Sequence, residues 1–416
     1  MSGTHQAPKG TFDILPEQEA ARALVYTHGA ILLDAAGYGR IETPAFEDTD
    51  LFERGVGEAT DIVRKEMFSF EDLGGRNVTL RPEATAPICR AYIEHGMHKL
   101  PQPVKLWCWG PFFRYERPQE GRFRQFNQID AEAIGTDAPE ADAEMIVLLD
   151  ELLRGLGIEG LELRLASLGS GDTRAGYREE LRDYLRAHES ELSDDVRSRI
   201  DANPMRAFDS DHPGTREVMA RAPQMLERLS GEDAEHFEAV KRMLDAAGVP
   251  YRLDGSLVRG LDYYTRTVFE FDCDRLGAQS GIGGGGRYDG LVELLGGPPT
   301  PAVGWAAGIE RILLALAEPP QPAVPEVFVV ASPGDGERAF ATALELRRAG
   351  VATQFDLARR SHKGQMKQAD RSGARVAAIL EPDGRVSLRE MASGEQREVS
   401  HEEAAAKIVA SRPASA

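Results

Sequence analysis

The densest group of residues able to bind an anionic substrate lies between residues 113 and 126. This segment contains four arginines and two glutamates among aromatic residues. Planar guanidinium groups bind phosphate oxygens through pairs of parallel hydrogen bonds. The segment is therefore a candidate phosphate-binding site, although a hairpin with a solvated charged face would have the same composition.

A second candidate lies at a predicted strand-to-helix junction, where Glu83 and Thr85 stand two residues apart. A carboxylate and a hydroxyl in this arrangement can bind an ammonium group. They can equally cap the helix that follows. The residues by themselves leave both interpretations open.

Three further segments combine glycine with arginine or tyrosine, namely residues 257–266, 281–290 and 304–311. The glycine run at 281–286 formally satisfies the dinucleotide-binding pattern G-x-G-x-x-G. We reject that interpretation, because the run has antiparallel surroundings and no acidic residue about 20 positions downstream in a βαβ unit. We expect these glycines to line a substrate pocket.

Short strands and tight turns must position these residues. Residues 67–71 and 77–81 flank Gly74-Gly75, which predicts a β-hairpin. Residues 104–116 and 123–133 predict a second antiparallel pair around a polar loop. The part of the chain that carries the chemistry is therefore expected to contain an antiparallel sheet.

The remaining pattern predicts two domains. Proline at position 16 and Gly37 predict a helix between them, followed by a strand at 40–46. An acidic, helix-periodic segment at about 173–248 predicts a helical insertion. Four prolines within 318–325 predict a stiff linker. We expect a catalytic domain at 1–318, a linker at 319–325 and a second domain at 326–416.

The second domain alternates strand-like and helix-like runs, which predicts a small α/β unit with a mostly parallel sheet. We expect strands and helices, in chain order, at 327–331, 336–349, 351–354, 363–372 and 376–380.

Composition excludes several classes of protein. No apolar run is long enough for a membrane helix, and residues 1–10 do not resemble a secretory signal, so we expect a cytoplasmic protein without membrane contact. Cys89, Cys108 and Cys273 are widely spaced, which indicates structural thiols and no protein metal site. The formal net charge of −19 would repel nucleic acid, so any RNA contact must be local.

Taken together, these motifs resemble those of class II aminoacyl-tRNA synthetases. Residues 37–46 resemble motif 1, residues 113–116 with the loop after them resemble motif 2, and residues 304–311 resemble motif 3. Residues 259–264 and 283–290 are similar to two peptides that distinguish histidyl-tRNA synthetases. The resemblance spans residues 9–399.

The resemblance implies an α+β fold, with an antiparallel class II sheet flanked by helices, a helical insertion and a C-terminal α/β anticodon-binding domain. It implies that the protein activates histidine with ATP, releasing pyrophosphate, and transfers histidine to the 3′ end of a histidine tRNA. The reaction needs cations near the phosphates, because most catalysis of this kind is positioning and electrostatic stabilisation.

The resemblance also implies roles for ATP-binding residues. Arg114 and Arg259 would hold the α-phosphate from opposite sides, and Arg311 would hold the γ-phosphate. Glu116 would lie near the adenine, and Phe126 would stack on it. Mg²⁺ would bridge the β and γ phosphates.

For histidine, the resemblance implies a pocket that pairs each polar group of the amino acid. Glu83 and Thr85 would bind the ammonium, and Gln128 would bridge ammonium and carboxylate. Arg114 and Arg259 would also contact histidine. Glu132 and Tyr264 would bind the two nitrogens of the imidazole ring. Tyr263 and Tyr288 would form the walls of the histidine pocket. Ala84 departs from the glycine that is usual in the family and adds one methyl.

The resemblance places tRNA at two surfaces. Gln119 and Arg122 would meet the acceptor end, and the second domain would bind the anticodon. Residues 326–400 carry 12 Lys and Arg against 11 Asp and Glu, and the basic residues concentrate at 359–375. From that segment we expect phosphate contacts by Arg360, Lys363 and Lys367.

The motif 1 region also implies a homodimer. One alternative has the same catalytic fold without the enzyme activity, namely the regulatory subunit of ATP phosphoribosyltransferase. It lacks an anticodon domain and several signature residues, whereas this chain has Arg114, Arg259, Tyr264 and Arg311.

Overall fold

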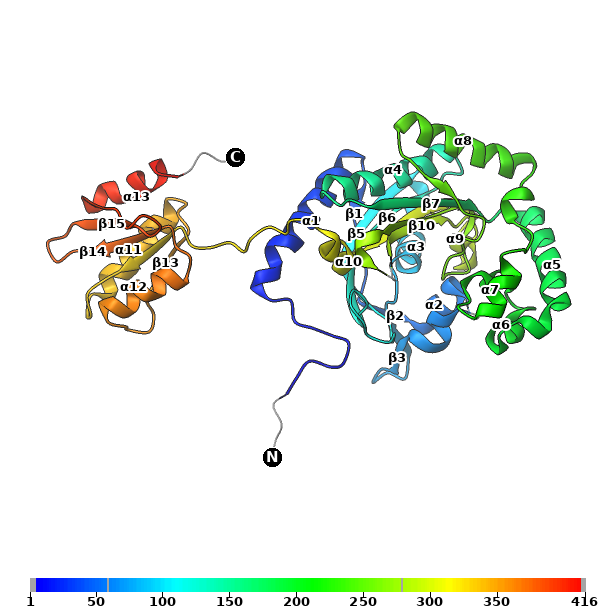
Figure 1. Ribbon diagram of the computed structural model, residues 1–416, viewed down its shortest axis with the longest axis horizontal. Helices are drawn as coiled ribbons and strands as arrows, with labels where there is room; N and C mark the ends of the chain where they lie inside the picture. The colour runs from blue at the N-terminus through cyan, green and yellow to red at the C-terminus, as the bar shows by residue number, and fades with distance from the viewer. Residues whose placement is uncertain (1–4, 58–59, 278–279, 413–416) are drawn as a thin grey trace. The chain divides into compact units, whose positions relative to one another are not determined.

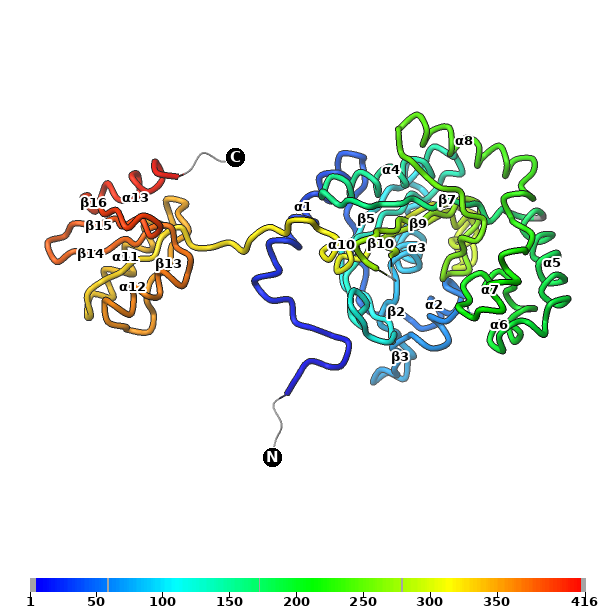
Figure 2. The backbone as a smooth tube through the Cα atoms, in the orientation of Figure 1, coloured from blue at the N-terminus to red at the C-terminus, as the bar shows by residue number. Residues whose placement is uncertain are grey.

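The chain forms two compact units, which divide between residues 320 and 321. The computed structural model describes residues 5–57, 60–277 and 280–412. Figure 1 shows the elements of each unit, and Figure 2 follows the backbone through them.

The larger unit is built on an eight-stranded sheet with the order β1-β5-β6-β11-β10-β9-β7-β8. All neighbours between β5 and β7 are antiparallel, and the two short edge strands pair in parallel. The predicted antiparallel sheet is confirmed, and β10 has no βαβ context for a dinucleotide. The strands are β1 (Gly39–Arg40), β5 (Val104–Phe113), β6 (Gln125–Ile134), β7 (Leu161–Ser167), β8 (Arg252–Leu253), β9 (Thr265–Cys273), β10 (Gly281–Arg287) and β11 (Ala302–Gly308).

One face of this sheet packs against helices that share its main hydrophobic core, in which Trp305 and Phe269 meet Leu149 and Val240. These helices are α1 (Pro16–Ala35), α4 (Pro139–Gly155), α8 (Gly231–Ala247) and α10 (Ile309–Ala315). Helix α1 has Pro16 in its first turn, where a missing N–H costs nothing, and it is followed by Gly37 with a positive φ.

A second hydrophobic core includes α3 (Thr85–Glu94) and α9 (Leu291–Leu294), with side chains such as Ile88 and Leu291. Beside α3 lies a small sheet with the order β2-β4-β3, formed by β2 (Phe46–Asp48), β3 (Phe68–Glu71) and β4 (Asn77–Leu80). The predicted hairpin at 67–71 and 77–81 is confirmed. The helix α2 (Thr49–Val56) and the π-helix η1 (Ile62–Glu66) pack nearby.

The single strand predicted at 40–46 is wrong. The segment forms two short strands in different sheets, β1 beside β5 and β2 beside β4. Pro44 has no N–H to donate to a ladder. The carbonyl groups of Thr43 and Pro44 instead accept hydrogen bonds from the Arg81 guanidinium, at 2.8 and 3.5 Å.

Between β7 and β8 the chain is helical. Helices α5 (Gly171–Ala187), α6 (Asp194–Arg199) and α7 (Pro213–Met219) lie together, and α8 returns to the sheet (Figure 1). The short turns of 3₁₀-helix in the unit are Met97–Lys99, Glu189–Glu191, Pro204–Asp209, Met225–Glu227 and Asp274–Leu276.

The smaller unit has a five-stranded sheet with the order β13-β12-β14-β15-β16. The α/β pattern is confirmed, but the sheet is not mostly parallel. Two pairings are parallel and two are antiparallel, because a hairpin of β15 and β16 adds to β14. The elements are β12 (Val327–Val330), α11 (Gly336–Arg348), β13 (Thr353–Phe355), α12 (His362–Arg371), β14 (Val376–Leu380), β15 (Val386–Glu390), β16 (Gln396–Val399) and α13 (His401–Ala410).

The three cysteines are buried and carry no disulfide, as expected for structural thiols. Across the described ranges, no helix is both long and apolar enough to cross a bilayer.

Candidate active site

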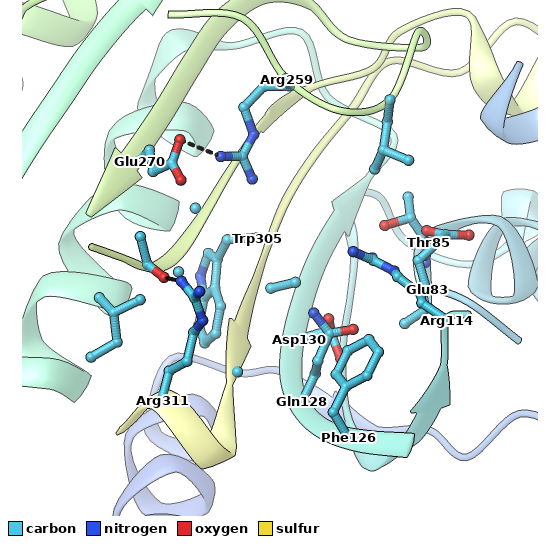
Figure 3. Close-up of a pocket in the computed structure, with 18 of the residues that line it drawn as sticks. Glu83, Thr85, Arg114, Phe126, Gln128, Asp130, Arg259, Glu270, Trp305 and Arg311 are labelled. Carbon is cyan, nitrogen blue, oxygen red and sulfur yellow. Dashed lines mark hydrogen bonds and ion pairs between the residues drawn. The ribbon is translucent and has the colours of Figure 1, made fainter. Parts of the chain in front are cut away.

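A pocket opens on the large sheet, where the ends of β5 and β6 face β10, β11 and the loop before β9 (Figure 3). Helix α3 closes one side, and the start of α10 closes the other. The pocket brings together most of the predicted substrate-binding side chains, namely Glu83, Thr85, Arg114, Glu116, Arg122, Phe126, Gln128, Arg259, Tyr263, Tyr264, Tyr288 and Arg311.

Three arginines reach the pocket from different elements. Arg259 and Arg311 lie on one side, and Arg114 faces them from the other (Figure 3). The Arg114 Nε donates to the carbonyl of Pro82 at 2.9 Å, and its guanidinium lies 5.3 Å from the centre of the Phe126 ring. These contacts fix the plane of the guanidinium and leave its other donors for a ligand.

Arg259 and Arg311 are held differently. Arg259 forms an ion pair with Glu270 at 3.0 Å, and Gly284 on β10 leaves room for it, because a Cβ there would lie 3.1 Å from the Arg259 Nη1. Arg311 donates to the backbone carbonyl of Gly281. Burial and the positive charge of Arg122 lower the pKa of Arg311. A buried cation beside another cation is a favourable place for an anion.

Besides Arg114, the loop between β5 and β6 carries three predicted binding residues, of which Glu116 and Arg122 line the pocket and Gln119 does not. Glu116 forms an ion pair with Arg122 at 2.8 Å. Gln119 and Arg122 pair through their backbones and are exposed, but only Arg122 belongs to the pocket lining.

The opposite end of the pocket is rich in hydrogen-bond acceptors. The Glu83 carboxylate accepts hydrogen bonds from the backbone N–H groups of Thr85 and Ala86, at 2.7 and 2.9 Å. Glu83 therefore caps α3, the function that its sequence position also suggested, while it still lines the pocket. Burial raises its pKa. Ala84 is buried beside it, and its extra methyl lines the pocket.

Glu132 lies behind this end of the pocket rather than in its lining. Its carboxylate accepts a hydrogen bond from the Thr85 hydroxyl at 2.6 Å and another from Tyr288. Gly304, opposite Glu132 on β11, leaves the space for this carboxylate. Burial raises the pKa of Glu132 to about 8.

Strand alternation on β6 places Gln128 and Asp130 on the same pocket wall as Phe126. The Gln128 Oε1 is buried and accepts no hydrogen bond from the described residues. Tyr264 stacks near Tyr263, with ring centres 4.7 Å apart, and lies under the Arg259 guanidinium. These side chains make a wall with aromatic surface and open acceptors.

Several pocket residues were not predicted as binding residues, among them Glu270, Trp305 and Asp130. Glu270 lies on β9 within Thr265–Cys273, and Trp305 lies on β11. Strand alternation marks Glu270 as the polar residue between two buried phenylalanines, but it cannot show that Arg259 from a distant loop pairs with it. Asp130 was placed on the correct face without a role.

The predicted tRNA contacts of the smaller unit lie on or beside α12. Lys363 and Lys367 are exposed one helical turn apart. Arg360 is exposed and forms an ion pair with Asp356. Arg375 belongs to the same basic segment, but its guanidinium pairs with Glu326 and Glu390 and ties β14 to neighbouring elements. The basic surface is therefore smaller than the sequence count implied.

No group of three or more His, Cys, Asp or Glu side chains able to hold a metal ion occurs within 5–57, 60–277 or 280–412. The pocket does offer separate carboxylates at Glu116 and Glu270. Mg²⁺ is commonly bound by one or two carboxylates together with substrate phosphates and water, so this arrangement fits an ion that arrives with a nucleotide.

Comparison with known proteins gives a consistent result. Residues 10–312 match the family "Histidyl-tRNA synthetase", and residues 327–411 match "Anticodon binding domain". The histidine--tRNA ligase of Rubrobacter xylanophilus is 48% identical over 95% of this chain and 97% of its own length. That of Thermosynechococcus vestitus is 46% identical over 94% and 93%.

The crystal structure of apo Staphylococcus aureus histidyl-tRNA synthetase is 35% identical. It covers 97% of this chain and all of its own, with a TM-score of 0.82.

Proposed function

The chain belongs to the histidyl-tRNA synthetase family, and we propose that its pocket forms histidyl-adenylate from histidine and ATP and then transfers histidine to tRNA. It is a histidine-tRNA ligase of the class II aminoacyl-tRNA synthetases. One observation carries the proposal for the pocket. Arg259 and Arg311 lie on one side of the pocket, Arg114 faces them from the other, and carboxyl, amide and tyrosine side chains line the acceptor-rich end. The three arginines suit the phosphates of a nucleotide, and the acceptors suit an amino acid with several N–H donors.

In the first reaction, a histidine carboxylate oxygen attacks the α-phosphorus of ATP, and pyrophosphate leaves. Arg114 and Arg259 lie on opposite sides of the pocket, so we assign them to the α-phosphate and the amino-acid carboxylate. We assign Arg311 to the γ-phosphate. Fixed cations favour the transition state because negative charge grows there, and they need no reorganisation during the reaction.

We assign the adenine to Phe126 and Glu116. The Phe126 ring lies in the pocket wall, which suits a base stacked on its face. Mg²⁺ would be held by the β and γ phosphates with Glu116 or Glu270. When bound, it would neutralise phosphate charge.

We assign histidine to the acceptor-rich end. Glu83, Thr85 and Gln128 are the proposed ligands of the ammonium group, and Glu132 and Tyr264 are those of the imidazole ring. Tyr263 and Tyr288 form the walls. Since Glu132 lies behind Thr85 and Tyr288, its effect on the ring would be direct only if these side chains shift when histidine binds.

In the second reaction, the terminal ribose of tRNA attacks the histidyl carbonyl, and AMP leaves. We assign the acceptor end to the exposed loop with Gln119 and Arg122. We assign anticodon-stem phosphates to Arg360, Lys363 and Lys367. The match of residues 327–411 to an anticodon-binding family supports this assignment and disfavours the regulatory subunit of ATP phosphoribosyltransferase.

The test is ATP-pyrophosphate exchange with each of the twenty amino acids, followed by charging of histidine tRNA. Exchange with histidine alone is the expected result. Exchange with none of the amino acids would favour the regulatory function.

We also propose a homodimer that uses the motif 1 region. Large apolar side chains are exposed on α1 and the small sheet, including Leu24, Ile31, Phe46 and Phe70. Exposed apolar surface of this kind is typical of an interface. Sedimentation at micromolar concentration should give twice the 45.5 kDa chain mass, and an active monomer would contradict the proposal. We infer a cytoplasmic location from the tRNA substrate.

A further inference from the structure

The acceptor-rich end of the pocket holds more carboxyl groups than the assignments above use. An amino-acid ammonium carries three N–H donors and a positive charge. In a buried site, each donor needs an acceptor, and the charge needs a counter-charge. The ammonium group should therefore lie near a carboxyl group whose oxygens accept few hydrogen bonds from the protein.

Two of the three carboxyl groups already accept hydrogen bonds from the protein on both oxygens. Glu83 receives the backbone N–H groups of Thr85 and Ala86. Glu132 receives the hydroxyls of Thr85 and Tyr288, and it does not line the pocket. These contacts reduce the capacity of both groups to bind three new donors.

The third carboxyl group, Asp130, is different. It lines the pocket, and only 2% of its surface is exposed. Among the described residues it hydrogen-bonds only with the Cys108 thiol, at 3.4 Å from Oδ2. A thiol is a weak donor, so this contact compensates little of the cost of burying a carboxylate.

A second observation points to the same place. Gln128 precedes Asp130 by two residues on β6, so both side chains emerge on the pocket face. The Gln128 Oε1 is buried without a partner among the described residues. Figure 3 shows the two side chains beside each other, across from Glu83 and Thr85. Two adjacent acceptors with unused capacity can accept hydrogen bonds from a bound ligand.

We propose that Asp130 is a further histidine-binding residue, whose carboxylate acts with the Gln128 amide oxygen to bind the ammonium group of the substrate. The proposal rests on the proposed function and adds a residue to it. Glu83 stays a proposed ligand of the ammonium group, although its carboxylate is shared with the cap of α3.

The charged and titratable groups around Asp130 make its binding role sensitive to pH. The groups that act on it are Cys108 on β5, Arg81, Arg114, Glu83 and, two residues along its own strand, Glu132. Burial raises the pKa of Asp130 to about 8. An ammonium group favours the carboxylate, so it lowers this pKa, and histidine binding near neutral pH should release a proton.

Calorimetry of histidine binding to the full chain at pH 7, in two buffers of different ionisation enthalpy, measures both affinity and proton release. We expect Asp130→Asn to weaken histidine about tenfold to hundredfold, because the amide keeps the shape but loses the charge. We expect it to reduce the proton release, with the remainder from Glu132, while the ATP affinity changes less than about threefold. Unchanged histidine affinity and unchanged proton release in the variant would overturn the proposal.

A substrate analogue separates ammonium binding from ring binding. Imidazolepropionate keeps the ring and the carboxylate but has no amino group. The wild-type protein should prefer histidine strongly, and Asp130→Asn should reduce that preference by about the same factor by which it loses histidine affinity. If both ligands weaken equally, Asp130 contacts the ring or the carboxylate, and the assignment to the ammonium is wrong.

Cys108→Ala is the matched control, because it removes the thiol that touches Asp130 without changing the pocket lining. It should bind histidine within about threefold of wild type. If it loses affinity and proton release as Asp130→Asn does, Asp130 acts through strand packing, and the proposal fails. Wild-type exchange activity with histidine tests the proposed function separately from all these outcomes.

Discussion

At the scale of single residues, Arg259 offers the sharpest test of the electrostatic mechanism. Its guanidinium is held against Glu270, and it faces Arg114 across the pocket. A cation aimed at charge that develops during the reaction acts mainly on the rate constant. Arg259→Ala should therefore lower the activation rate about 100-fold or more, with much smaller changes in histidine and ATP affinity.

Single-turnover adenylate formation with measured dissociation constants checks this prediction. Glu270→Gln is the control, since it keeps Arg259 but removes its charged partner, and it should reduce the rate less. Equal losses of rate and ground-state binding in Arg259→Ala would instead indicate a structural arginine.

Glu132 tests how the pocket selects histidine. A site with buried hydrogen-bonding groups rejects analogues that leave them unpaired by up to about 10⁴-fold to 10⁵-fold. Glu132→Ala should sharply weaken histidine use and leave ATP affinity nearly intact, and Glu132→Gln should be milder because its amide oxygen still accepts. Tyr288→Phe removes one of the two hydroxyls that hold Glu132 but keeps the carboxylate, so it should weaken histidine use less than Glu132→Ala does. Wild-type discrimination against apolar ring analogues in Glu132→Ala would exclude this role.

The same carboxyl groups predict a pH dependence of stability. Burial raises the pKa values of Asp130 and Glu132 to about 8, so the folded protein binds more protons than the unfolded chain between about pH 4 and pH 8. Stability of the free enzyme should therefore fall as pH rises toward 8, by at most about 1.4 kcal/mol per pH unit for each group. Urea unfolding between pH 6 and 9 measures this slope. The double variant Asp130→Asn and Glu132→Gln should flatten it, and a slope unchanged by both substitutions would contradict the cause.

The sequence predicted much of the candidate pocket at this scale because motif residues are local. Phe126 lies on β6, and Arg114 and Glu116 lie in the loop that joins β5 to β6, so all three belong to one hairpin that can be read from the sequence. The partner of Arg259 could not be read in this way, because Glu270 belongs to β9 and pairs with it only after the loop folds back. Likewise, the two contacts that occupy Glu132 come from α3 and from the end of β10.

At the scale of elements, a buried ion pair joins α4 to β10, the strand that contains the glycine run. Arg287 at the end of β10 and Asp142 on α4 are fully buried and paired, and His236 on α8 lies 3.3 Å from Asp142. Burial alone would raise the pKa of Asp142, but His236 and Arg287 outweigh burial and lower it. The cluster therefore links α8 and α4 to the strand that precedes Tyr288.

Removing one partner of a buried pair leaves an uncompensated charge, so Asp142→Ala should destabilise the larger unit by about 3–5 kcal/mol. Tryptophan fluorescence in urea reports on this unit, because Trp107, Trp109 and Trp305 all lie within it. Glu162→Ala breaks the exposed pair with Arg252 and should cost about 0–1 kcal/mol. Similar losses in both variants would argue against the buried cluster as an anchor.

Elements were predictable where one local pattern dominated. The hairpin of β3 and β4 follows from its glycine turn, and α1 follows from its proline start. Residues 40–46 were misread as one strand because Pro44 and the Arg81 guanidinium divide the segment between two sheets, and the contact with Arg81 cannot be read from the segment itself. The hairpin of β15 and β16 was missed because β16 is an exposed, charged edge strand and β15 is short, so neither shows a clear alternation of apolar and polar residues.

At the scale of the whole molecule, the division of the chain predicts a division of labour. The pocket residues all lie before residue 320, and the exposed lysines of α12 lie after it. Activation needs histidine and ATP, whereas charging also needs the tRNA. A chain that ends at Pro325 should therefore keep pyrophosphate exchange within about threefold and lose most of its charging efficiency, because tRNA phosphates lose their basic contacts.

Truncation can affect the protein in ways other than the loss of tRNA contacts. A charge reversal in the full chain tests the tRNA contacts alone. Lys363→Glu with Lys367→Glu should raise KM for tRNA and reduce its dependence on salt, because fewer counterions are released when fewer cations bind phosphate. Arg385→Glu is the matched control, since that arginine is exposed but paired with Asp383 and Glu398. If the truncated chain loses exchange as completely as charging, the smaller unit must support the catalytic fold itself, and an anticodon role alone could not explain its presence.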